Sequence, residues 1–217
     1  MNRSEIKTLA KEKVKGNKWN ILWPLLVISV INSVLSNLFG PKIDLTALQN
    51  IEDATKITHF SFGSSAGLLV VGLITGIISA GYLKYILNYV RTGKFNTDEI
   101  INTIKNKWVD LLIGTLLSGI IIGLLSILLV IPGIIAAFAL AMVSFLIIDK
   151  DVKGSDSLKA SKDLMKGHKW NYFVFKLSFI GWYLLVPFTL GILLIWLIPY
   201  VQVATVIYYD KLVSLKK

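Results

Sequence analysis

One short motif precedes the apolar stretches that decide the fold: KGNKWN (residues 15–20), KNKW (105–108) and KGHKWN (166–171). Each copy places lysine beside tryptophan, directly before a long apolar run. At a membrane surface the lysine ammonium stays in water while the indole lies at the level of the lipid headgroups. The motif therefore predicts three points at which the chain enters a bilayer. The predicted membrane-interface residues are Lys18, Trp19, Lys107, Trp108, Lys169 and Trp170.

The apolar content of the chain also indicates a membrane protein. Of 217 residues, 54% are hydrophobic, and the mean hydropathy of +0.67 is far above what a soluble domain needs. A helix needs about 20 apolar residues to cross about 30 Å of hydrocarbon, and the sequence offers six candidate segments, of which the fourth is short. The predicted spans are residues 19–39, 67–90, 109–131, 133–148, 171–189 and 190–209.

These spans predict an all-α fold, a polytopic six-helix transmembrane bundle that forms a single integral membrane domain over residues 1–217. We expect three hairpins, each preceded by a cytoplasmic interfacial amphipathic helix. Common descent of the three units and repeated selection of the same interface residues both explain the pattern. The units are residues 4–90, 97–148 and 155–209, and an outer loop at 40–66 lies within the first.

Turns and lead-in helices complete this architecture. Pro132-Gly133 predicts a tight outer turn in the second unit, and Pro187 or Gly191 predicts one in the third. Ahead of each Lys-Trp pair the sequence has a short helical pattern in which apolar residues share one face, and in the first and third patterns lysines occupy the other face. Such helices either lie in the membrane interface or pack on the bundle as ordinary solvated helices.

The distribution of charge predicts the orientation. Of 23 Lys and Arg, 19 fall on one side of the predicted spans, and only Lys42 and Lys56 lie in the outer loop. Because short loops rich in Lys and Arg stay in the cytoplasm, we expect a multi-pass protein of the bacterial plasma membrane with both termini cytoplasmic. The net charge of +10 then forms a cytoplasmic collar that attracts anionic headgroups. Nucleic acid is not expected as a partner, since no segment is long enough to form a folded basic domain.

Four polar residues are candidates for a role inside the membrane: Lys84, Lys176, Gln202 and Thr205. Each lysine lies about six residues from a cytoplasmic boundary, so its side chain can snorkel to the headgroups. The alternative is an anion-binding pair within the bundle. Gln202 and Thr205 can hydrogen-bond between helices or line a cavity.

The sequence offers little for enzymatic chemistry. It has no cysteine, and the two histidines fall on opposite sides of the predicted membrane. HExxH, Walker and GxSxG motifs are absent. Asp149-Lys150-Asp151 resembles a metal-binding cluster only faintly, and we interpret it as a solvated helix cap. We therefore expect no enzyme, no catalytic or metal-binding residues and no cofactor.

Several strings resemble a known family. SLKASKDLMKGHKW (157–170), LSFIGW (177–182) and IPGII (131–135) are similar to those of uncharacterised integral membrane proteins of Firmicutes, grouped as domain of unknown function 975. The resemblance covers almost the whole chain. It implies a bacterial plasma-membrane location and distant kinship with the membrane domains of some glycerophosphodiester phosphodiesterases, and it supplies no activity.

The leading hypothesis is a non-enzymatic plasma-membrane protein with a structural, regulatory or partner-binding role. Its expected partners are a bilayer with anionic headgroups and another membrane protein, and the sequence does not indicate an oligomeric state. The alternative is a small permease or export accessory for a lipid-like or peptide substrate. A polar cavity lined by Lys176, Gln202 and Thr205 would favour transport, and a packed apolar interior would favour the first role.

Overall fold

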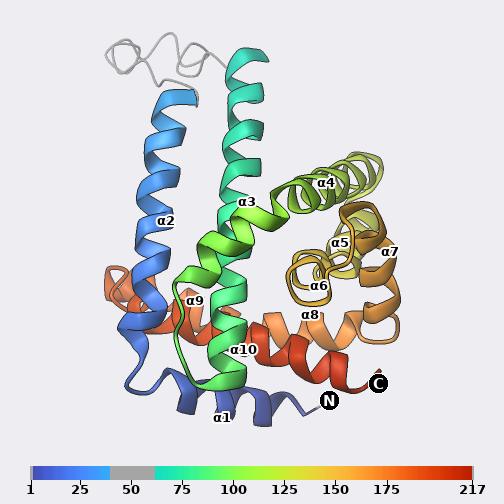
Figure 1. Ribbon diagram of the computed structural model, residues 1–217. Helices are drawn as coiled ribbons and strands as arrows, with labels where there is room; N and C mark the ends of the chain where they lie inside the picture. The colour runs from blue at the N-terminus through green and yellow to red at the C-terminus, as the bar shows by residue number, and fades with distance from the viewer. Residues whose placement is uncertain (1, 40–61, 217) are drawn as a thin grey trace.

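The computed structural model describes residues 2–39 and 62–216, and every regular element within these ranges is helical (Figure 1). The predicted outer loop at 40–66 falls almost entirely outside them. The elements in chain order are α1 (Arg3–Val14), α2 (Lys18–Phe39), α3 (Phe62–Thr92), α4 (Asp98–Leu128), α5 (Val130–Ala139), α6 (Val143–Lys150), α7 (Gly154–Met165), α8 (Lys169–Leu177), α9 (Ile180–Leu184), the 3-10 helix η3 (Pro187–Thr189) and α10 (Leu194–Ser214).

Four helical segments in the described part of the chain are long and apolar enough to cross a membrane. They are Lys18–Phe39, Ala66–Thr92, Asp98–Leu128 and Val130–Lys150, the last combining α5 and α6. The all-helical class and the first four predicted spans therefore agree with the structure. The boundaries differ in the second unit, where the predicted amphipathic lead-in and the span after it form one continuous helix, α4.

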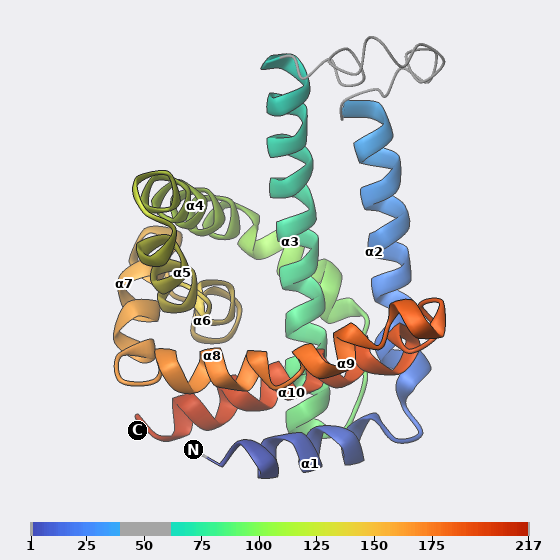
Figure 2. The ribbon, with the colours of Figure 1, turned by 180° about the vertical axis from the view of Figure 1, so that it is seen from behind.

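The structure differs from the prediction at the fifth and sixth predicted spans. Residues 171–189 are divided among α8, α9 and η3, and α10 follows after a reverse turn at which Leu190 and Gly191 have φ values of 49° and 83°. The predicted turn at Pro187 or Gly191 is thus present. Figures 1 and 2 show α8 to α10 lying crosswise to the upright pair α2 and α3. The count of six spans is not confirmed.

The turn of the second unit lies three residues earlier than predicted. The helix breaks at Leu129, where the backbone is extended with φ −156° and ψ 132°. Pro132 and Gly133 belong to α5 instead, because proline is well tolerated in the first turn of a helix, where its missing N–H has no partner to lose. Gly133 lies against Ser126 of α4, so closely that a Cβ would overlap that side chain.

Two lead-in helices are covered by protein on their apolar side. In α1, Ile6, Ala10 and Val14 are at most 1% exposed, and the helix packs on α10. In α7, Leu164 and Met165 are also buried, at 8% and 0% exposure, and the helix packs on α4 and α6. The structure therefore favours the second alternative for these segments, amphipathic helices packed on the bundle.

The core is centred on α10, which is buried along most of its length between α1, α2 and α3. Aromatic rings from α6 and α8 stack on its C-terminal half. Phe145 lies parallel to Tyr209 with 4.6 Å between ring centroids, and Phe175 lies 4.8 Å from Tyr208. Burial of these large side chains removes much apolar area from water and supplies most of the local stability.

Candidate functional site

Three helix ends meet at one arginine. Arg91, in the last turn of α3, hydrogen-bonds Asp149 at the end of α6 through Nη1 and, at 3.1 Å, through Nη2. Its Nε and Nη2 also donate to Asp210 of α10, at 2.9 and 2.6 Å. Tyr209 donates its hydroxyl to Asp149 at 2.8 Å. We call Arg91, Asp149, Tyr209 and Asp210 the ionic junction.

The ionic junction was not predicted, and Asp149 corrects an expectation. Its side chain is 4% exposed, so it is a buried partner of Arg91 rather than a solvated cap. Asp149 and Asp151 do not form a metal-binding pair, because Asp151 is bound instead by Lys107 at 2.6 Å. A clue was available in the sequence, since Arg91, Asp149 and Asp210 each end the last apolar run of their unit.

Two of the four polar candidates lie together. Lys176 of α8 donates from Nζ to Oγ1 of Thr205 at 2.8 Å, and its ammonium lies 5.5 Å from the ring centre of Tyr172. Within the described residues no carboxylate pairs with it. Burial lowers the pKa of Lys176, which lies outside the four candidate spans, to about 8. Gln202 lies one turn before Thr205 and is half-buried.

The other candidate, Lys84, bonds to the end of a neighbouring helix. Its Nζ donates to the backbone carbonyl of Ile148 at 3.0 Å. That carbonyl belongs to the last turn of α6, where carbonyl groups lack partners within the helix. Lys84 therefore ties α3 to α6 about two turns before Arg91 on α3, and it is not paired with Lys176 as an anion-binding site.

The three predicted interface pairs have different surroundings. Trp19, Trp108 and Trp170 are exposed, with 66%, 52% and 72% of the residue surface accessible. Lys107 forms its ion pair with Asp151, and this contact holds the pKa of the Asp151 carboxyl below its usual range. Lys169 instead borders an apolar groove, so the repeated motif serves different contacts in different units.

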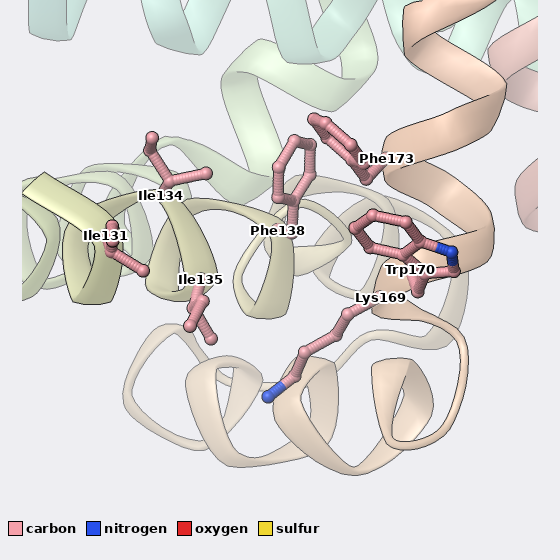
Figure 3. Close-up of a pocket in the computed structure, with 7 residues that line it drawn as sticks. All are labelled: Ile131, Ile134, Ile135, Phe138, Lys169, Trp170 and Phe173. Atoms are coloured by element: carbon pink, nitrogen blue, oxygen red, sulfur yellow. The ribbon is translucent and has the colours of Figure 1, made fainter.

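That groove lies between α5 and α8 and has a volume of about 470 Å³. Its lining is almost wholly apolar, and Lys169 contributes the charged group (Figure 3). Phe138 and Phe173 meet edge to face, 5.5 Å apart, and Trp170 lies 5.1 Å from Phe173. The lining residues are Ile131, Ile134, Ile135, Phe138, Lys169, Trp170 and Phe173.

The described residues contain no group of three or more His, Asp or Glu side chains placed to hold a metal ion. What the geometry offers is of two other kinds. The ionic junction and the Lys84 contact hold helix ends together, whereas the α5/α8 groove presents an open apolar surface beside a cation. The first arrangement suits a rigid membrane body and the second suits an amphipathic ligand.

Comparison with known proteins identifies the family. No curated protein and no solved structure matches the chain. A model described as "Protein of unknown function (DUF975)" matches residues 1–132 and 120–216, which together cover nearly the whole sequence. The resemblance noted in the sequence strings is thereby confirmed at the level of the family. The chain belongs to the DUF975 family of proteins of unknown function.

Proposed function

We propose that the protein is a non-enzymatic scaffold of the bacterial plasma membrane, with a structural, regulatory or partner-binding role. The supporting observation is the packed interior around Lys176 and Thr205. These side chains satisfy each other by a hydrogen bond, and the α10 residues from Val203 to Tyr209 are all buried. Such an interior suits a rigid body that presents its surface to partners.

The ionic junction supports the same proposal. Transporters that work by alternating access move one bundle against another around a central site. Here a single guanidinium joins the ends of α3, α6 and α10, and Lys84 adds a second tie between α3 and α6. Relative movement of these helices would separate the buried Asp149 carboxylate from the Arg91 guanidinium, at a cost of about 2 kcal/mol.

We further propose that both termini face the cytoplasm and that the basic collar attaches the protein to anionic lipid. Both termini lie at the same end of the molecule, near α1 (Figures 1 and 2). Four spans return the chain to the side on which it began. The excess of Lys and Arg in the segments assigned to that side favours the cytoplasm.

Single-cysteine labelling tests the scaffold proposal, because the chain has no native cysteine. Gln202→Cys and Thr205→Cys report on the interior, and Ser155→Cys, at an exposed position after α6, is the matched control. In membrane vesicles a hydrophilic maleimide should label the control rapidly and the two interior positions at least about tenfold more slowly. Labelling of Gln202→Cys and Thr205→Cys as fast as the control would contradict the scaffold and favour the permease.

The same control tests orientation. Ser155→Cys should be labelled in inside-out vesicles and protected in intact cells from a reagent that cannot cross the membrane. Labelling in intact cells would place α7 and the collar outside and would overturn the proposed topology.

A further inference from the structure

The α5/α8 groove is placed where it can meet lipid. Ile131, Ile134 and Ile135 are 72%, 48% and 50% exposed, and they lie on α5, the first part of a candidate membrane span. Large apolar side chains with this exposure would be costly in water. In a bilayer the same surface lies against hydrocarbon.

The dimensions of the groove suit a hydrocarbon chain. From Ile131 to Phe138 the α5 wall rises about 10 Å, at about 1.5 Å per residue. The volume of about 470 Å³ lies within the usual range of small-ligand sites, roughly 300–1,000 Å³. Trp170 and Phe173 of α8 form the opposite wall. Among the described residues, Lys169 alone adds a charge to the lining, so most of a ligand in the groove must be apolar.

Lys169 determines which lipid fits best. Figure 3 shows its stem running beside the groove and its amine reaching toward Ile135, at the edge of the apolar lining. Trp170 lies next to it and is 72% exposed, as expected of a residue at headgroup level. A cation at the mouth of an apolar groove is complementary to an anionic headgroup whose acyl chain lies inside.

We propose that the α5/α8 groove binds one acyl chain of an anionic membrane lipid and that Lys169 holds its headgroup. The inference goes beyond the proposed function, because it assigns one lipid to one groove and does not depend on the side of the membrane on which the basic collar lies. It is independent of the packed interior around Thr205, so the labelling test of the scaffold and the test below fail separately.

Fluorescence quenching tests the groove directly. Five of the six tryptophans are replaced by phenylalanine to leave Trp170, and the protein is reconstituted with brominated phosphatidylglycerol or brominated phosphatidylcholine. The anionic lipid should quench Trp170 with an apparent association constant about fivefold higher, as expected for one lysine near an anionic headgroup. Lys169→Gln should abolish this preference. A second variant, Ile135→Phe, narrows the groove and should weaken quenching by both lipids.

The first copy of the motif supplies the control. A protein that retains only Trp19, similarly exposed at 66%, should show no change in lipid preference on Lys169→Gln. Native mass spectrometry of protein with all its tryptophans gives a second readout, in which Lys169→Gln should lower retained phosphatidylglycerol. The proposal is overturned if both lipids quench Trp170 equally, if Lys169→Gln leaves the preference intact, or if neither lipid quenches Trp170 because another protein or a second copy covers the groove.

Discussion

Removal of the Arg91 guanidinium should destabilise the protein more than any other single loss of charge at the ionic junction. In Arg91→Leu, Asp149 keeps the Tyr209 hydroxyl at 2.8 Å and the Lys150 ammonium at 3.8 Å. It loses two hydrogen bonds to the guanidinium, although its side chain is only 4% exposed. A buried carboxylate would thus be left without its main partner.

The magnitude follows from burial. Loss of one partner from a fully buried ion pair costs about 3–5 kcal/mol. Arg91 itself is 36% exposed, so water can replace part of what the guanidinium supplies, and exposed pairs contribute only about 0–1 kcal/mol. We therefore expect Arg91→Leu to lower the free energy of unfolding by about 2 kcal/mol. Arg91→Lys keeps the charge but loses the planar fork, and should lower it by about 1 kcal/mol.

Unfolding in detergent micelles by titration with sodium dodecyl sulfate, followed by far-UV circular dichroism, measures these differences. The matched control is Arg3→Leu, which removes the other arginine of the chain from an exposed position on α1. It should change the free energy of unfolding by less than about 0.5 kcal/mol.

A double-mutant cycle isolates the pair. Arg91→Leu, Asp149→Leu and the double variant should give a coupling free energy of at least about 1 kcal/mol. A coupling below about 0.5 kcal/mol, or an effect of Arg91→Leu no larger than that of Arg3→Leu, would refute the assignment of Asp149 as a buried, dependent charge.

Four further substitutions are measured by the same titration. Because burial lowers the pKa of Lys176 to about 8 from 10.5, the unfolded chain binds more protons between these values. The free energy of unfolding of the protein should therefore rise with pH across that window by up to about 3 kcal/mol more than that of the Lys176→Met variant. If the pH profiles of the two proteins are parallel, this prediction is refuted. Gly114→Ala places a Cβ 2.7 Å from Ile147 and should cost about 1–2 kcal/mol. In Gly119→Ala, on the same helix, the added Cβ meets nothing within 4 Å, so this variant should be more stable by up to about 1 kcal/mol. Equal effects of Gly114→Ala and Gly119→Ala would contradict the close packing of α6 against Gly114. Ser161→Ala removes a hydroxyl that serves two backbone groups at the α5–α6 break and should cost about 1–3 kcal/mol, whereas a neutral effect would mean that those groups find other partners.

The apolar runs allowed the helical class and four spans to be predicted because hydrocarbon thickness sets a minimum length that composition alone reveals. The structure of the third unit could not be predicted in this way. Its residues 171–189 are apolar enough to be counted as a span, but the reverse turn near Leu190 and the breaks before α9 and η3 depend on backbone geometry. Its last helix, α10, is covered by α1, α2 and α3, and an apolar pattern does not distinguish burial by protein from burial by lipid.

Amphipathic patterns had the same ambiguity. The apolar face of α1 was evident from Ile6, Ala10 and Val14, but whether that face met lipid or α10 depended on tertiary contacts. Small residues were equally ambiguous. Gly114 is enclosed by α6 and α7, whereas Gly119 on the same helix faces open space. Periodicity identifies a face, and only packing decides what covers it.

The ionic junction explains why polar residues were harder to interpret than apolar ones. Asp149 and Asp210 lie 58 and 119 residues after Arg91 along the chain. In the sequence, each of the three resembles an ordinary charge at the end of a helix. Their common position at the end of the last apolar run of each predicted unit was visible in the sequence, and in the structure α3, α6 and α10 bring the three side chains within hydrogen-bonding distance. Opposite charges at equivalent positions of separate units are therefore a signal of contact between those units. The signal depends on shared topology, not on distance in sequence, and it can be applied wherever the ends of apolar runs carry unmatched Arg and Asp.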